Sequence, residues 1–332
     1  MKILSGDIGG TNARLALCEV EGRTVRRDIQ ATYDSQRYDT LADIARDFIS
    51  EHKIEVRNAC FGVPGPVQGR RAQVTNLPWN VDADELERNL GIDSVFLLND
   101  LEANAHGLET LSDADFKELR AGSGVSGNAG LLSAGTGLGE AGLVWDGQRH
   151  RPFACEGGHT DFAPRDDEEI DLHRFLRDKF GPHVSWERCV SGPGLVNIYE
   201  FYLSVDPGAE DKALAEAIAS GNDPAAEISK AAASGKGSLA YRAVMKFLAL
   251  YGAEAGNLAL KVLAVSGMYL GGGIAPKLAP LLPESDFIER FQAKGRMRPL
   301  LETIGLSIVM NDRAALQGAA SYAARRARGE QA

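Results

Sequence analysis

The chain of 332 residues has few cysteines and no long apolar run. Its four cysteines are far apart and form no CxxC pair, and no secretory signal pattern opens the sequence. Such cysteine usage favours a reducing, cytoplasmic environment. Even the apolar stretch near Val262 is interrupted by Lys261 and Ser266, whereas a membrane span needs roughly 18 apolar residues. We therefore expect a cytoplasmic protein without a membrane partner.

Positive charge is also scarce. Lys and Arg number 36 against 46 Asp and Glu, for a net charge of -10. Because nucleic-acid phosphates require a concentrated basic surface, we expect no nucleic-acid partner. Low-complexity tracts and repeats of 20 to 50 residues are absent. The length is about twice that of a common domain, so we expect two domains with a cleft between them.

The stretch 6–17, GDIGGTNARLAL, predicts a strand, a tight turn and a second strand. Gly9 and Gly10 lie where a hairpin needs positive φ or close backbone approach, and they leave N–H groups open to an anion. Asp7 at the strand end could hold a hydrated Mg²⁺ that bridges phosphate oxygens. The alternative is an ordinary glycine-rich hairpin with an exposed aspartate.

Two further strands of the first half end in polar or rigid residues. The apolar strand 59–63 runs into the turn Pro64-Gly65-Pro66. The strand 94–98, SVFLL, is apolar throughout, as in a sheet buried on both faces, and is followed by Asn99, Asp100 and a helix. Open α/β sheets bind ligands at such carboxyl ends of strands. The alternative is that Asn99 or Asp100 only caps the helix.

The second half repeats the first. After a polar, glycine-rich stretch at 112–128, which we interpret as the domain junction, a short strand at 131–132 leads into the turn 133–139, SAGTGLG, and into renewed alternation. Residues 137–142 match G-x-G-x-x-G, but a strand follows them instead of the helix that a dinucleotide site requires. Two glycine-rich hairpins, one in each half, can grip a nucleotide from two walls.

The loop around residues 153–161 is dense in polar groups. Cys155 and His159 suggest zinc, but no second ligand pair stands at the right spacing, so Glu156 and His159 fit better as groups that bind hydroxyls. A purely structural role for His159 is the alternative.

Three helix starts complete the pattern. Ser191 is a predicted N-cap with a proline just inside its helix, which places Glu187 shortly before a helix start. The glycines 271–273 let a flat base or sugar approach the backbone, the alternative being a flexible turn. Asp312 is predicted to cap the final helix, which runs through Ala327.

These motifs, in this order, resemble those of bacterial glucokinases of the hexokinase, actin and Hsp70 ATPase superfamily. The matching stretches are GDIGGTN at 6–12, PGP at 64–66, LND at 98–100, AGTGLG at 134–139, EGGH at 156–159, WERCVSGPGL at 186–195 and GGGI at 271–274. The chain has neither the cysteine-rich zinc motif nor the N-terminal helix-turn-helix of repressor-type sugar kinases, which favours the zinc-free branch.

The resemblance implies an α/β, two-domain, actin-like (ribonuclease H-like) ATPase fold, with nucleotide and sugar in the interdomain cleft. The small α/β domain would comprise residues 1–111 and 312–332, and the large α/β domain residues 112–311. The phosphates and Mg²⁺ would be bound by Asp7, Gly9, Gly10 and Thr11, with Asp7 holding the metal through water. The phosphates would also contact Thr136 and Gly137, and the adenosine would contact Gly272 and Gly273. The sugar would be bound by Asn99, Asp100, Glu156, His159 and Glu187.

The expected activity is transfer of the γ-phosphoryl group of ATP to the 6-hydroxyl of D-glucose, giving glucose 6-phosphate and ADP in the first step of glycolysis. Asp100 is the candidate base. The domains would close only on sugar, because water is as good an acceptor as a sugar hydroxyl. A kinase for another hexose and a non-catalytic, sugar-sensing actin-like protein are the alternatives. The family resemblance suggests a homodimer, whereas the hexose, the phosphate donor and any allosteric control stay open.

Overall fold

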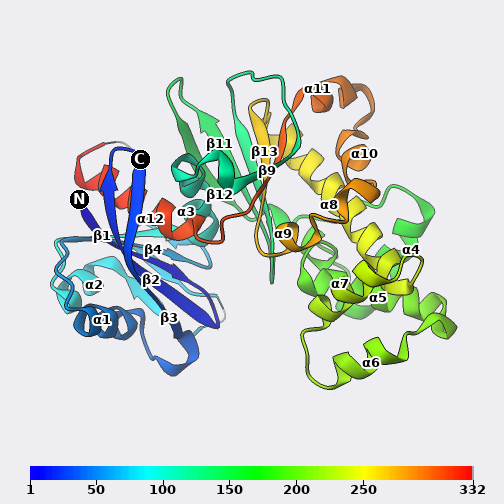
Figure 1. The fold of residues 1–332 in the computed structure, drawn as a ribbon, viewed down its shortest axis with the longest axis horizontal. Coiled ribbons are helices and arrows are strands. Elements are labelled where there is room, and N and C mark those ends of the chain that lie inside the picture. The colour runs from blue at the N-terminus through cyan, green and yellow to red at the C-terminus, as the bar shows by residue number, and fades with distance from the viewer. Residues whose placement is uncertain (76, 331–332) are drawn as a thin grey trace. The chain divides into compact units, whose positions relative to one another are not determined.

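The computed structural model describes residues 1–75 and 77–330, which divide into two compact units (Figure 1). Unit 1 comprises Met1–Asp115, Gln148–Ala154 and the segment from Asn311 on. Unit 2 comprises Phe116–Gly147 and Cys155–Met310. Each unit is built around one main β-sheet. No helix among the described residues is both long enough and apolar enough for a membrane crossing.

The main sheet of unit 1 has five strands in the order β3-β2-β1-β4-β8. Their bounds are β1 Lys2–Ile8, β2 Asn12–Glu21, β3 Thr24–Asp34, β4 Asn58–Val63 and β8 Ser94–Asn99. The first three strands are antiparallel neighbours, whereas β1, β4 and β8 run parallel. The carboxyl ends of β1, β4 and β8 therefore meet at one edge of the sheet. A small sheet of β5 (Val67–Gln68), β6 (Arg71–Gln73) and β7 (Asn80–Asp82) accompanies it.

Helices cover both faces of this sheet (Figure 1). Leu4 on one face packs in a core with α1 (Leu41–His52) and α2 (Ala83–Leu90). Its neighbour Ile3 points to the opposite face and packs in a second core with α3 (Asp100–Gly107) and α12 (Ala314–Ala327). This switch of face between adjacent residues is the period-2 pattern of a strand buried on both sides.

The sheet of unit 2 repeats the same succession. Its strands β11 (Leu138–Trp145), β10 (Ala129–Ala134), β13 (Gly267–Gly271), β14 (Leu306–Val309) and β9 (Phe116–Arg120) lie in this order. An antiparallel hairpin, β10-β11, is followed by two strands parallel to β10, as β1-β2 is followed by β4 and β8. The strand β12 (His150–Cys155) follows β11 in the chain. The internal repetition inferred from the sequence is therefore present in the topology.

The core of unit 2 is organised around α8 (Leu239–Val262), which is buried along most of its length. Phe287 and Phe291 of α10 (Phe287–Gln292) approach it so closely that a Cβ on Gly252 or Gly256 would overlap their carbonyl oxygens. The other helices are α4 (Asp167–Phe180), α5 (Gly192–Val205), α6 (Lys212–Ala219), α7 (Pro224–Ser234), α9 (Ile274–Leu278) and α11 (Arg298–Thr303).

Short 3-10 helices connect these elements. They are η1 (Ser35–Arg37), η2 (Leu108–Thr110), η3 (Asp113–Asp115), η4 (Gly157–His159), η5 (Trp186–Arg188), η6 (Pro207–Ala209), η7 (Leu282–Glu284) and η8 (Gly295–Met297).

The structure corrects one local prediction and adds a strand to the stretch interpreted as the domain junction, within which unit 1 ends at Asp115 and unit 2 begins at Phe116. The predicted cap of the last helix is wrong, since Arg313 occupies the N-cap position without a side-chain bond and Asp312 lies beside Arg14, whose Nη1 donates to the Asp312 carbonyl oxygen at 3.0 Å. The stretch 112–128 contains a strand, β9, which pairs with β14 at the edge of the sheet.

Candidate active site

The hairpin turn between β1 and β2 is held by backbone bonds and by one buried serine. The Gly9 N–H donates to the Asn12 carbonyl oxygen at 2.9 Å. Ser35 Oγ donates to Gly9 O at 2.8 Å, and the Ser35 N–H donates to Thr11 O at 2.9 Å. Neither Gly9 nor Gly10 has positive φ, but a Cβ on Gly9 would lie only 2.9 Å from Asn12 O. Close backbone approach, and not a left-handed conformation, therefore requires glycine at position 9.

Asp7 lies beside this turn, near the end of β1. Its carboxyl group is in a poorly solvated position, and burial raises its pKa, while Arg14 opposite it lowers the pKa and Asp312 raises it again. The charge of Asp7 is therefore incompletely compensated by the chain itself. A hard cation that takes carboxylate and water oxygens fits this position, so the residues present are compatible with Mg²⁺.

Asn99, the last residue of β8, and Asp100, which follows it, were predicted either to contact a ligand or to cap the next helix. Asn99 caps α3, since its Oδ1 accepts from the N–H groups of Leu101 (3.0 Å) and Glu102 (3.4 Å). Its Nδ2 donates to Gly65 O at 3.1 Å and so ties the helix start to the Pro-Gly-Pro turn. The partly buried Asp100 is the first residue of α3, and its Oδ1 accepts from the Leu101 N–H at 2.9 Å. The capping interpretation is thus correct for Asn99.

The parallel strands bring Asp7 and Asp100 to the same edge of the sheet. In β4 the residue beside Asp7 is Gly62, and the last pair of β4 and β8 is Val63 with Asn99. A Cβ on Gly62 would lie 2.9 Å from Ala103 Cβ and 3.6 Å from Asp100 Cα, so α3 packs directly on β4. Two strand spacings, about 10 Å, separate β1 from β8. The metal candidate and the base candidate are therefore neighbours across one strand.

The second glycine-rich turn, between β10 and β11, is fixed to the start of α5. The Gly135 N–H donates to Gly137 O at 2.9 Å, and the Gly192 N–H donates to Gly135 O at 2.8 Å. Thr136 is at the tip of this turn. The predicted N-cap Ser191 is confirmed, since its Oγ accepts from the Gly194 N–H at 3.0 Å.

Glu187 lies against the same turn. Its Oε2 accepts from the Leu138 N–H at 3.0 Å, and a Cβ on Gly137 would lie 2.6 Å from that oxygen. Gly137 is thus needed to admit the carboxylate. Glu187 belongs to η5, and the structure joins it directly to the predicted phosphate turn.

Glu156 is the N-cap residue of the short helix η4 and His159 is its last residue, and η4 adjoins η5. Their side chains are exposed and face each other, with 3.9 Å between His159 Nε2 and Glu156 Oε2. The Trp186 N–H donates to Thr160 O at 3.0 Å, so the two segments are linked. The structure therefore brings together Glu156, His159 and Glu187 within unit 2.

His183 is a neighbour of this site that the sequence analysis missed. One of its ring nitrogens lies 3.0 Å from Asp161 Oδ1 and the other 3.0 Å from His159 O. It supports the backbone of the His159 segment. No motif in the sequence marks it.

A cavity of about 820 Å³ in unit 2 opens beside the Thr136 turn. Thr136 and Gly273 both line it, together with the apolar residues Pro193, Val196, Ala226, Ile274 and Leu278, which the sequence analysis did not single out. Gly272 has φ +79°, and a Cβ there would overlap the Ala134 carbonyl oxygen. Gly272 therefore shapes the turn, while Gly273 faces the cavity.

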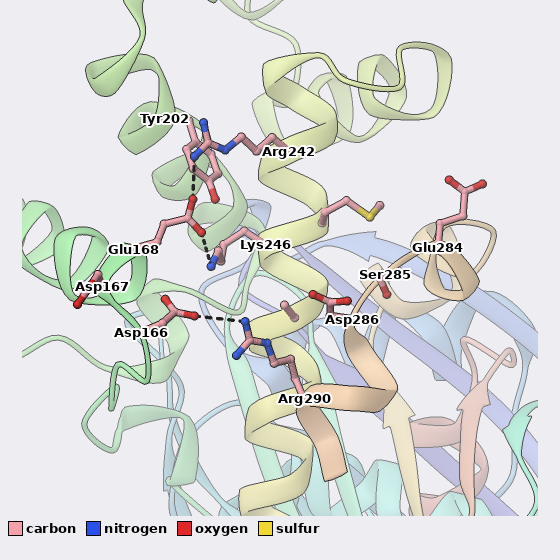
Figure 2. Close-up of a pocket in the computed structure, with 12 residues that line it drawn as sticks. Asp166, Asp167, Glu168, Tyr202, Arg242, Lys246, Glu284, Ser285, Asp286 and Arg290 are labelled. Carbon is pink, nitrogen blue, oxygen red and sulfur yellow. Dashed lines mark hydrogen bonds and ion pairs between the residues drawn. The ribbon is translucent and has the colours of Figure 1, made fainter. Parts of the chain in front are cut away.

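A second hollow of unit 2, of about 580 Å³, is strongly charged (Figure 2). Glu168 lies 2.5 Å from Lys246 Nζ and 2.8 Å from Arg242 Nη2, and Asp166 lies 3.2 Å from Arg290 Nη2. Burial alone would raise the pKa of Glu168, but Lys246 and Arg242 outweigh it and lower the pKa to about 2. These ion pairs link Asp166 and Glu168, at the start of α4, to α8 and α10.

Comparisons with known proteins show which family the chain belongs to. The model of the glucokinase family matches residues 4–326. The glucokinase of Trichormus variabilis is 40% identical over 338 residues, which cover 97% of this chain and 99% of that protein. A glucokinase from an Antarctic psychrotroph superposes with a TM-score of 0.83 at 31% identity, covering 98% of this chain and 99% of that one.

A ROK family glucokinase from Streptomyces griseus, in complex with glucose and AMPPNP, shares the fold with a TM-score of 0.68 at 22% identity, covering 98% of this chain and 100% of that one. The fold is accordingly the two-domain, actin-like α/β ATPase fold of these sugar kinases. The chain belongs to the glucokinase family.

Proposed function

We propose that the chain transfers the γ-phosphoryl group of ATP to the 6-hydroxyl of D-glucose, giving glucose 6-phosphate and ADP. ATP-dependent phosphorylation of glucose is the reaction of the family to which the chain belongs. The structural observation that carries the proposal is the cavity of about 820 Å³, lined by Thr136 and Gly273. Its size and apolar walls suit a nucleoside, and the glycine-rich turn at its rim suits phosphates.

Phosphate binding depends on backbone groups and on one metal ion. The sequence has no P-loop lysine, so the N–H groups of Gly10 and Thr11 in the first turn and of Thr136 and Gly137 in the second would supply the positive dipoles, whereas the Gly9 N–H is already bonded to Asn12 O. Asp7 would hold Mg²⁺ through water, and the bound ion would neutralise phosphate charge. Burial of Asp7 beside Asp312 supports this assignment, because it leaves a negative charge that a cation stabilises.

Proton transfer is assigned to Asp100. A sugar hydroxyl is a weak nucleophile, and in a loose phosphoryl-transfer transition state it needs an acceptor for its proton and precise alignment. Asp100 stands at the carboxyl end of β8, in the first turn of α3. Asn99 orients the start of α3 through its cap, and the second hydrogen of its Nδ2 remains for a sugar hydroxyl.

The sugar is assigned to polar side chains that accept hydrogen bonds from hydroxyls. Glu156 and His159 present exposed polar groups on one segment, and Glu187 approaches from the adjoining one. The Streptomyces griseus glucokinase holds glucose and AMPPNP in one complex, which supports this pairing of ligands.

The cellular setting is part of the proposal. The four scattered cysteines support a protein that acts in the cytoplasm. The net charge of -10 argues against a nucleic-acid partner, and the family resemblance supports a homodimer. Glucose 6-phosphate formation would then be the first step of glycolysis.

The test is ADP release from ATP, measured with glucose, fructose, mannose and N-acetylated hexosamines at matched concentrations. We expect kcat/KM for glucose to exceed that for every other sugar by about tenfold or more. A higher kcat/KM for another hexose would assign a different substrate. Sugar and nucleotide binding without ADP release would instead identify a sensing protein.

A further inference from the structure

Glu140 is a buried carboxyl group that the proposed mechanism does not use. It is the third residue of β11, pairs with Leu132 in the β10-β11 ladder, and is only 1% exposed. Among the described residues, no donor group lies within hydrogen-bond distance of either carboxyl oxygen. Such an unpaired polar group is costly to bury, so its place in the fold requires a reason.

The carboxyl group of Glu140 lies directly beneath η4. A Cβ on Gly157 would overlap Glu140 Oε2, and a Cβ on Gly158 would overlap Leu138 O. Cys155 Sγ, just before η4, lies 3.5 Å from Glu140 O. The two buried glycines between Glu156 and His159 therefore rest on the first residues of β11.

The groups that face Glu140 come from α8 and from the segment around Cys155. The buried Glu254 already accepts from Asn257 Nδ2 at 2.6 Å and from Lys261 Nζ at 3.1 Å. Lys294 Nζ donates to Asn257 Oδ1 at 2.5 Å and so adds a second cation on the Glu254 side. Lys261 is thus bonded to Glu254 and Lys294 to Asn257, and neither donates a hydrogen bond to Glu140. The Cys155 thiol carries no positive charge.

An ionised Glu140 would therefore lie beside a second carboxylate, and Lys261, which is already paired with Glu254, would compensate its charge only in part. Burial first, and the Glu254 carboxylate second, raise the pKa of Glu140, and a proton on Glu140 supplies the donor for a hydrogen bond to Glu254. A neutral Glu140 can donate a hydrogen bond to the Glu254 carboxylate, whereas two ionised carboxylates cannot form this bond and repel each other.

We propose that Glu140, as a neutral acid hydrogen-bonded to Glu254, is a positioning residue for sugar binding, because it supports the Gly157–Gly158 backbone from which Glu156 and His159 project. This inference rests on the proposed sugar contacts of Glu156 and His159. Loss of the proton would place two negative charges under the segment and displace it. Sugar affinity should then fall in alkaline solution, while the nucleotide cavity keeps its shape.

The test compares the wild type with Glu140→Ala and Glu140→Gln, using Glu118→Gln on the exposed face of β9 as a matched control. We expect Glu140→Ala to raise the glucose KM by about fivefold or more with the ATP KM within about twofold, and Glu140→Gln to restore it. Between pH 7 and 9 the glucose KM of the wild type and of the control should rise, whereas that of Glu140→Gln should not.

Thermal unfolding tests the charge state without reference to activity. The folded protein holds a proton on Glu140 that the unfolded chain loses near its ordinary pKa, so the stability of the wild type falls as pH rises toward the raised pKa. We expect the Tm of Glu140→Gln to gain about 3 °C on the wild type per pH unit in that window. Parallel Tm curves for the two proteins would overturn the proposal.

His159→Ala distinguishes the positioning role of Glu140 from the sugar contacts on which it depends. A glucose KM raised by His159→Ala but unchanged by Glu140→Ala would overturn the positioning role alone. If neither variant changes the glucose KM, the proposed sugar contacts are overturned together with it.

Discussion

Two neighbouring residues of one motif have different roles in this structure. Gly272 and Gly273 are adjacent and were both predicted to serve the adenosine. In the structure Gly272 has φ +79° and no room for a Cβ, whereas Gly273 has no atom within 4 Å of its Cβ position and lines the nucleoside cavity. One glycine is required by the backbone and the other by the proposed ligand.

The two glycines should therefore respond differently to alanine. Gly272→Ala is expected to lower the free energy of unfolding by about 2–4 kcal/mol, since the new methyl group overlaps the Ala134 carbonyl oxygen and the backbone is left-handed. Gly273→Ala should keep the Tm and raise the ATP KM by about tenfold, with the glucose KM within about twofold. Chemical denaturation and steady-state kinetics on both variants check this, and an unchanged unfolding midpoint for Gly272→Ala would contradict it.

Sequence reasoning at this scale found the residues that stand in motifs and missed those that support them. A local signal marks each of these residues, since Asp7 and Asn99 stand at the ends of strands and Asp100 and Glu187 near the starts of helices. Ser35 stands 26 positions from Gly9, to which its hydroxyl donates, and nothing around it indicates that bond. Contacts made across the chain by a short side chain depend on the fold and leave no pattern in a single sequence.

At the scale of elements, the contact between α3 and α12 positions the proposed base. A Cβ on Gly318 of α12 would overlap the carbonyl oxygen of Ala103, and a Cβ on Gly107 of α3 would overlap that of Ala314. The buried Arg325 adds a bond to His106, with 2.8 Å between Nη2 and Nδ1. Since α3 begins at Asp100, the C-terminal helix fixes the helix on which the base stands.

Gly318→Ala is expected to push α3 away from α12. We expect a loss of about 2–4 kcal/mol of stability and a fall in kcat of about tenfold or more, because Asp100 moves with its helix. Arg326→Ala, on the exposed side of α12, is the matched control and should leave both values unchanged. A Gly318→Ala enzyme with normal kcat and normal Tm would show that the two helices do not constrain Asp100.

Periodicity and caps predicted most elements, because apolar alternation and N-cap residues are local properties. The strand β9 was missed since it is an edge strand with exposed positions, such as Lys117 and Glu118, and its partner β14 lies far along the chain. The cap assigned to Asp312 was wrong for a similar reason. An acid before a helix is a good N-cap, but here Asp312 lies beside Arg14 on β2.

At the scale of the whole molecule, one sheet topology occurs twice, and the two sheets have different proposed roles. In unit 1 the carboxyl edge of the sheet carries the candidate metal ligand and base, and in unit 2 the corresponding turn borders the cavity proposed to bind the nucleoside. The sequence predicted this repetition from its two glycine-rich hairpins. The proposed reaction needs residues of both units on the same pair of substrates.

Closure of the two units on glucose is the corresponding prediction. We expect glucose, but not L-glucose, to lower the radius of gyration measured by small-angle scattering, since an enzyme that excludes water must assemble its site around the sugar. An identical radius with and without glucose would contradict closure.

The measurement that tests the central claim most directly is glucose-dependent ADP release by Asp100→Asn, with ATP binding measured on the same preparation. Asp93→Asn, which removes an exposed carboxylate just before β8, is the control. The account predicts that Asp100→Asn loses about 10³-fold or more in kcat, equivalent to about 4 kcal/mol, with ATP affinity within about threefold of the wild type. Near-normal turnover by Asp100→Asn would contradict it.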